Sequence, residues 1–133
     1  MAVISSVNSI EDEDMSGFRA GRNIAMKVPP HQFEATVRFY RDVIGLPHLE
    51  AESEEYNQCF AFGSIKLWID RVPSLSQAEI WLEFECDDTS DAAKELEAAG
   101  VVRCDEIERL PATLDGFWIT NPAGIVHLVD NPS

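Results

Sequence analysis

Apolar and polar residues alternate in two short segments of the chain, and each segment leads into a stretch with helical spacing. Residues 23–28 and 81–86 both show the alternation, which is typical of a β-strand with one buried face. Helical stripes follow each of them and end at Gly45 and at Gly100, in positions that suit the left-handed end of a helix. The repetition predicts two similar supersecondary units.

Three short strand-like segments follow each predicted helix. They cover residues 48–52, 58–62 and 65–70 in the first half, and 101–107, 116–120 and 125–129 in the second. Each half therefore has the order β-α-β-β-β, and we predict an α+β fold in which two such units curl into a half-open barrel with a concave pocket. The first unit is expected over residues 22–71 and the second over 78–130, within one domain over 22–133. Residues 1–21 have no sustained period and are expected to form a flexible tail.

Strand alternation also predicts which side chains line the pocket. The apolar positions of the two leading strands are expected beneath the helices, with Leu82, Phe84 and Cys86 as the buried face of the second strand. The alternate positions then face the cavity, and they are Asn23, Ala25, Lys27, Trp81, Glu83 and Glu85.

Composition narrows the possible partners and the compartment. The formal net charge of −14 argues against nucleic-acid binding, because phosphates would be repelled, and it permits a cationic ligand. No apolar run reaches the roughly 20 residues that cross a bilayer, so no membrane partner is expected. The three cysteines lack the paired spacing of zinc or redox motifs, which favours a reduced protein in the cytoplasm.

Two motifs resemble those of a known family. Residues 39–46, FYRDVIGL, are similar to the helix-end signature of the glyoxalase, bleomycin-resistance and extradiol-dioxygenase superfamily, also called vicinal oxygen chelate proteins. Residues 116–124, GFWITNPAG, resemble its closing aromatic strand and Asp-Pro-x-Gly turn. The resemblance extends over about residues 22–130. It implies the duplicated fold, and a homodimer in which the second copy covers sheet edges and apolar surface.

The metal enzymes of this superfamily carry ligands on the first and last strands of each half. The matching positions here are Asn23, Trp68, Trp81 and His127, and the closing turn is one residue shorter than usual. Indole does not coordinate metals, and one imidazole with one amide falls short of the three protein ligands of a catalytic site. We therefore predict no metal and no other cofactor, unless the strand registers differ by two and Glu83 takes the position given to Trp81.

Two functions of different classes remain open. The favoured one is a glyoxalase/bleomycin-resistance-like protein that binds a cationic or aromatic small molecule in a metal-free pocket, since carboxylates near indoles suit a cation unless Lys27 or Lys66 neutralises them. The alternative is a lyase or dioxygenase-type enzyme with His127 and Glu83 as ligands or as acid and base. A structural homodimer with a filled pocket is a third reading. The candidate ligand-binding residues are Asn23, Lys27, Trp68, Trp81, Glu83, Glu85, Trp118 and His127.

Overall fold

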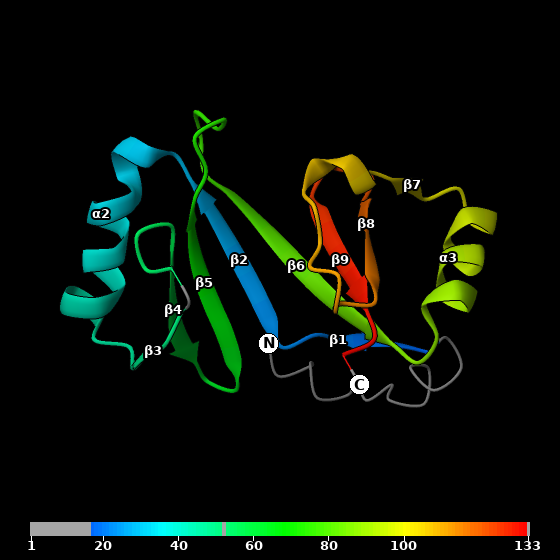
Figure 1. Cartoon of the computed structure of the whole chain (residues 1–133), viewed down its shortest axis with the longest axis horizontal. Coiled ribbons are helices and arrows are strands. Elements are labelled where there is room, and N and C mark those ends of the chain that lie inside the picture. The colour runs from blue at the N-terminus through cyan, green and yellow to red at the C-terminus, as the bar shows by residue number, and fades with distance from the viewer. Residues whose placement is uncertain (1–16, 52, 133) are drawn as a thin grey trace, which may run out of the picture.

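The secondary structure repeats one order twice along the chain. A computed structural model describes residues 17–51 and 53–132. After β1 (Phe18–Ala20), the first half contains β2 (Asn23–Val28), α2 (Pro30–Arg38), the π-helical η2 (Phe39–Ile44), β3 (His48–Leu49), β4 (Asn57–Phe62) and β5 (Ile65–Arg71). The second half contains β6 (Glu79–Cys86), α3 (Thr89–Ala98), β7 (Val102–Arg103), the 3-10 helix η3 (Asp105–Ile107), β8 (Gly116–Thr120) and β9 (Val126–Asp130). The predicted α+β fold of two β-α-β-β-β units is confirmed (Figure 1).

Nine strands of the described chain form one open sheet. The order is β3-β4-β5-β2-β6-β9-β8-β7, and β1 pairs with β6. The two halves meet where β2 pairs antiparallel with β6, which places Ala25 opposite Trp81. Within each half the first strand pairs in parallel with the last, so that Asn23 lies opposite Lys66 and Leu82 opposite His127. We call the side on which α2 and α3 pack the helix face, and the opposite side the cleft face.

The helix ends follow local sequence signals. Helix α2 continues as η2 and ends at Gly45, whose φ of 79° is a left-handed conformation that glycine adopts readily. Helix α3 begins after Asp88, whose side chain accepts a hydrogen bond from the Asp91 N–H at 2.9 Å. Within residues 17–51 and 53–132, no helix has the length and the apolar composition needed to cross a membrane.

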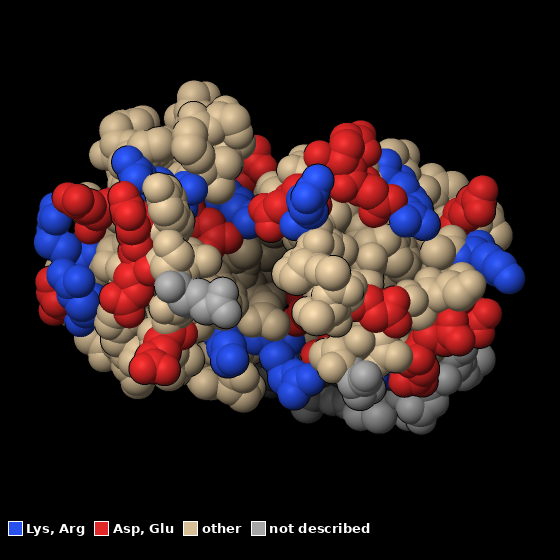
Figure 2. Space-filling model, viewed as in Figure 1, with Lys and Arg blue, Asp and Glu red and all other residues tan. Residues whose placement is uncertain are grey.

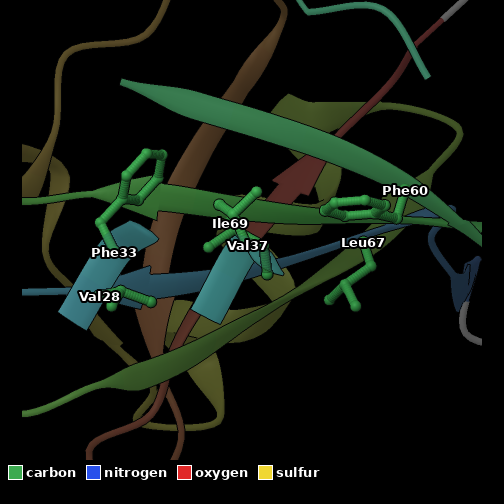
Figure 3. Packing of buried hydrophobic residues seen from close by; sticks show 6 residues of the cluster. All are labelled: Val28, Phe33, Val37, Phe60, Leu67 and Ile69. Carbon is green, nitrogen blue, oxygen red and sulfur yellow. The ribbon is translucent and has the colours of Figure 1, made fainter. Parts of the chain in front are cut away.

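Each helix covers a hydrophobic cluster of its own half. The cluster under α2 consists of Val28, Phe33, Val37, Phe60, Leu67 and Ile69 (Figure 3). The cluster under α3 consists of Cys86, Ala92, Phe117, Ile119 and Val129. The two helices lie at opposite ends of the molecule with β2 and β6 between them (Figure 1). Among the residues that the structure describes, no helix therefore covers the middle of β6 on the helix face.

The predicted buried face of β6 is wrong at two of its three positions. Leu82 and Phe84 are each 38% exposed, whereas Cys86 is buried as predicted. The alternation itself is present, because Trp81, Glu83 and Glu85 are buried on the other side of the strand. Coverage by neighbouring segments, and not hydrophobicity, decides which face of this strand is buried.

The strand predicted over residues 101–107 ends early. Only Val102–Arg103 form β7, and η3 follows at once. The side chain of Asp105 accepts a hydrogen bond from the Trp118 N–H at 2.9 Å, so a carboxylate takes the place of a strand carbonyl. The chain then leaves the sheet, and Leu110 packs on the cleft face.

The tail predicted for residues 1–21 does not extend that far. Residues 1–16 lie outside the described residues, but Phe18–Ala20 pair antiparallel with β6, with Arg19 opposite Glu85. At Gly21 the chain crosses the Glu83 side chain, and the Gly21 N–H donates to the Glu83 carbonyl at 2.8 Å. A Cβ on Gly21 would lie 2.7 Å from the Glu83 Cβ. Glycine is therefore required for this close approach.

Candidate functional site

A cleft separates the two halves of the molecule on the side opposite the helices. Figure 2 shows a hollow in the surface at the centre of the view, in front of the region that β2 and β6 occupy in Figure 1. Strand register places Asn23 opposite Lys66, and Ala25 opposite both Trp68 and Trp81, on this cleft face. The structure thus brings most of the predicted site residues to one surface.

A loop covers the second-half side of the cleft face. Trp81 and Trp118 pack edge to face with ring centres 5.3 Å apart. The Trp118 indole N–H donates to the Glu108 carbonyl at 2.9 Å, which fixes the loop over the two rings. Trp81 and Trp118 are consequently only 7% and 6% exposed. The residues packed around them are Ala25, Cys104, Leu110, Val126 and Leu128.

Lys27 is a buried cation whose charge is neutralised inside the protein. Its Nζ lies 2.7 Å from a carboxylate oxygen of Asp70 and 3.0 Å from one of Glu108. The same ammonium lies 4.2 Å from the centre of the Trp81 ring, a cation–π contact. Lys27 therefore lies on the cleft face, as predicted, and it joins the first half to the loop that carries Glu108.

The carboxylates of Glu83 and Glu85 are bound by the start of β2. Glu83 Oε1 accepts hydrogen bonds from the N–H groups of Arg22 and Asn23 at 2.8 and 3.1 Å, and from Asn23 Nδ2 at 3.1 Å. Glu85 Oε2 lies 3.1 Å from Arg22 Nε. The alternative that Lys27 or Lys66 neutralises these carboxylates is wrong, because Arg22 and the backbone N–H groups bind them.

Asp130 completes a cluster of three carboxyl groups on the cleft face. It is 2% exposed, and its Oδ1 has no hydrogen-bond partner among the described residues. Burial, a hydrogen bond with Glu83 and the charges of Glu83 and Glu85 raise the pKa of Asp130 to about 8, while Arg22 lowers it. The fold therefore favours the protonated, neutral form of the Asp130 carboxyl group.

Asn23 and Trp68 are the half-buried residues at the cleft floor. The Trp68 indole N–H donates to Asn23 Oδ1 at 2.8 Å, and Asn23 Nδ2 donates to Glu83. Both ends of the Asn23 amide are thus fixed. Next to them, Lys66 is exposed and lies opposite Asn23 in the register. Lys66 was not among the predicted ligand-binding residues, although it lies two positions before Trp68 on β5 and so shares its face.

His127 lies on the helix face and not in the cleft. The His127 ring stacks on the Phe84 ring with centres 5.3 Å apart. Its Nδ1 lies 3.0 Å from the Ile125 carbonyl oxygen. In the strand register, Leu128 and not His127 lies opposite Glu83. The prediction that His127 lines a pocket together with Glu83 is wrong. The closing turn is one residue shorter than the superfamily pattern, and a shift of one residue turns every side chain of a strand to the other face.

The residues at the ligand positions of the superfamily do not fit a metal ion. Asn23 Oδ1 is occupied by the Trp68 N–H, and the indoles of Trp68 and Trp81 offer no lone pair for coordination. The Lys66 ammonium beside Asn23 would repel a cation. In the part of the chain that the structure describes, no group of three His, Cys, Asp or Glu side chains is placed to hold a metal. The donor atoms at these positions therefore do not form a metal site.

Two surface grooves flank the helices, away from the cleft. The groove beside α3 has a volume of about 670 Å³ and that beside α2 about 570 Å³. Neither is lined by a predicted site residue, and both carry charges of mixed sign, such as Lys94 with Glu97 and Arg38 with Glu34. The cleft is the stronger candidate site, because aromatic and polar side chains converge there.

Comparison with known proteins supports the fold through structure and not through sequence. No family model and no curated protein matches the chain. The Mn(II)-bound glyoxalase from Novosphingobium aromaticivorans superposes with a TM-score of 0.60 and 24% identity, over 85% of this chain and 38% of that one. A glyoxalase/bleomycin resistance protein/dioxygenase superfamily member from Vibrio splendidus 12B01 superposes with a TM-score of 0.59 and 13% identity, over 81% of this chain and 97% of that one. Methylmalonyl-CoA epimerase from Mycobacterium tuberculosis superposes with a TM-score of 0.59 and 14% identity, over 86% of this chain and 88% of that one.

These similarities confirm the resemblance at the level of the fold. The chain has the fold of the glyoxalase/bleomycin resistance/dioxygenase superfamily. It spans 38% of the glyoxalase chain. Because one fold serves many activities, the manganese and the activities of these proteins do not transfer to this chain.

Proposed function

We propose that the chain binds a small aromatic molecule in the cleft between its two halves, without a metal ion. The observation that carries the proposal is the fixed pair of Asn23 and Trp68, joined by a 2.8 Å hydrogen bond at a ligand position of the superfamily. An indole whose N–H is already bonded presents its ring face to a ligand. A concave site with one oriented ring and a few polar groups is typical of small-molecule binding.

The enzyme alternative has less support from the arrangement of these residues. General acid–base catalysis needs a donor and an acceptor within reach of one substrate. Glu83 is covered by the backbone at Gly21 and bonded to Arg22 and Asn23, and His127 lies on the other face of the sheet. The two residues therefore cannot act on a common substrate in this fold.

The homodimer and the cytoplasmic location inferred from the sequence stay predictions. On the helix face of β6, Ile80 is 46% exposed and both Leu82 and Phe84 are 38% exposed. An apolar stripe of this kind supports a covering second copy. The stripe lies opposite the cleft, so a dimer formed through it would leave the cleft open.

Replacing Trp68 by leucine is expected to weaken the binding of an aromatic ligand about tenfold, because the ring surface of the cleft floor is lost. The measurement is calorimetric titration of chelator-treated protein with phenylacetate, 2-phenylethanol and 2-phenylethylamine. Phe39→Leu is the matched control, since Phe39 is 46% exposed on η2, outside the cleft. Equal affinity in wild type and Trp68→Leu, or binding that needs added zinc or manganese, would contradict the proposal.

A further inference from the structure

Lys66 is an exposed cation on the cleft face. It is exposed at the start of β5, and its side chain forms no ion pair or hydrogen bond with any residue in 17–51 or 53–132. On the same face Lys27 pairs with Asp70 and Glu108, Glu85 pairs with Arg22, and the exposed Glu79 accepts a hydrogen bond from the Trp81 indole N–H at 3.0 Å. Lys66 is therefore a positive charge at the floor of the cleft, next to Asn23 in the strand register, that remains available to a ligand.

A second cation lies beside Lys66. The Lys66 N–H donates to the Arg22 carbonyl at 2.8 Å, so the two residues are neighbours at the start of β2. Arg22 binds Glu85 through Nε, and 68% of its side chain is exposed. Figure 2 shows basic side chains gathered at the lower rim of the hollow, in a protein whose net charge is −14. A local positive rim of this kind attracts anions to the cleft.

The spacing between Lys66 and Trp68 fits a compact ligand. The two residues are two apart on β5, so both face the cleft, with Cα atoms about 6.6 Å apart. Their partners on β2 are Asn23 and Ala25, and the small Ala25 side chain leaves room in front of the indole. The flexible Lys66 side chain can bring its ammonium to a carboxylate that is held close to a ring on Trp68, as in an arylacetic acid.

We propose that the cleft selects an anionic aromatic molecule, with its carboxylate or similar group at Lys66 and its ring on Trp68. This rests on the proposed function and names the ligand class of the same site. It replaces the cationic ligand expected from the sequence. Glu83 and Glu85, which suggested a cation, are bonded to Arg22 and Asn23, so they offer no free charge to a ligand.

The test compares three molecules of one size and different charge. Phenylacetate, 2-phenylethanol and 2-phenylethylamine are titrated into wild type, Lys66→Met and Lys94→Met, the last carrying the same change on α3 outside the cleft. Phenylacetate is expected to bind best, to lose about tenfold in affinity in Lys66→Met, and to be unaffected in Lys94→Met. The neutral alcohol is expected to bind wild type and Lys66→Met equally.

The possible outcomes separate this inference from the function on which it rests. Preference for the amine, or phenylacetate binding that is equal in wild type and Lys66→Met, overturns the anionic class and leaves a small-molecule cleft standing. No binding of any of the three by protein with native circular dichroism overturns both. A Lys66→Arg variant that retains phenylacetate binding supports recognition by charge.

Discussion

Replacing Asp130 with asparagine is expected to make the protein increasingly more stable than the wild type as the pH rises from 3.8 to about 8, and to change its stability least at the acidic end of this range. The pKa of Asp130 is raised from 3.8 to about 8 in the fold, so between these values the folded state holds a proton that the unfolded state has lost. The stability of the wild type therefore falls as the pH rises through this window, by up to about 1.4 kcal/mol per pH unit. Asparagine cannot ionise, and its amide can donate to Glu83 as the protonated acid does.

Urea denaturation at pH 5, 7 and 9 measures this difference directly. The wild type is expected to lose stability across the series relative to Asp130→Asn. Glu97→Gln, an exposed change on α3, serves as the control and should follow the wild type. If Asp130→Asn were less stable than the wild type at all three pH values, Asp130 would have to be ionised and paired in the fold.

Replacing Lys27 with alanine is expected to cost about 3 kcal/mol of folding stability. The substitution leaves Asp70 and Glu108 without the ammonium that lies 2.7 and 3.0 Å from them, and breaking a buried ion pair on one side is strongly destabilising. It also removes the cation packed on Trp81 at 4.2 Å. Because Lys27 holds the loop that carries Glu108, the emission of Trp81 and Trp118 should shift to longer wavelength as the loop detaches.

Lys66→Ala is the matched control for this experiment, since it removes a lysine from the same face at an exposed position. We expect a change within about 0.5 kcal/mol. Equal effects of Lys27→Ala and Lys66→Ala in equilibrium denaturation would contradict the structural role of the Lys27 ion pairs.

Local patterns in the sequence were sufficient to predict the individual elements. The alternation over Asn23–Val28 predicted β2 with the bounds that the structure has, and Gly45 ends the first helical segment as expected. Periodicity reports which residues share a face, but it does not report what covers that face. The alternation therefore predicts Leu82 and Phe84 in the core, although no helix in the described chain covers them.

The chemistry of the site depended on contacts that no local pattern reveals. Glu83 is bound by the N–H groups of Arg22 and Asn23, which lie 61 and 60 residues away in the sequence. The face of His127 was decided by the length of one turn, since a single residue reverses the alternation of a strand. Such pairings are set by register between strands, and they decide whether a carboxylate is free for a ligand.

The central claim is that a small aromatic molecule binds on Trp68 in the cleft without a metal, and indole N–H resonances in an ¹⁵N–¹H NMR titration test it most directly. The three tryptophans give three such signals, and Trp68→Leu identifies one of them. In chelator-treated protein, phenylacetate is predicted to shift the Trp68 signal saturably, while the signal of Trp118, bonded to the Glu108 carbonyl beneath the loop, moves little. A Trp68 signal that does not move, or that moves only after zinc is added, would contradict the account.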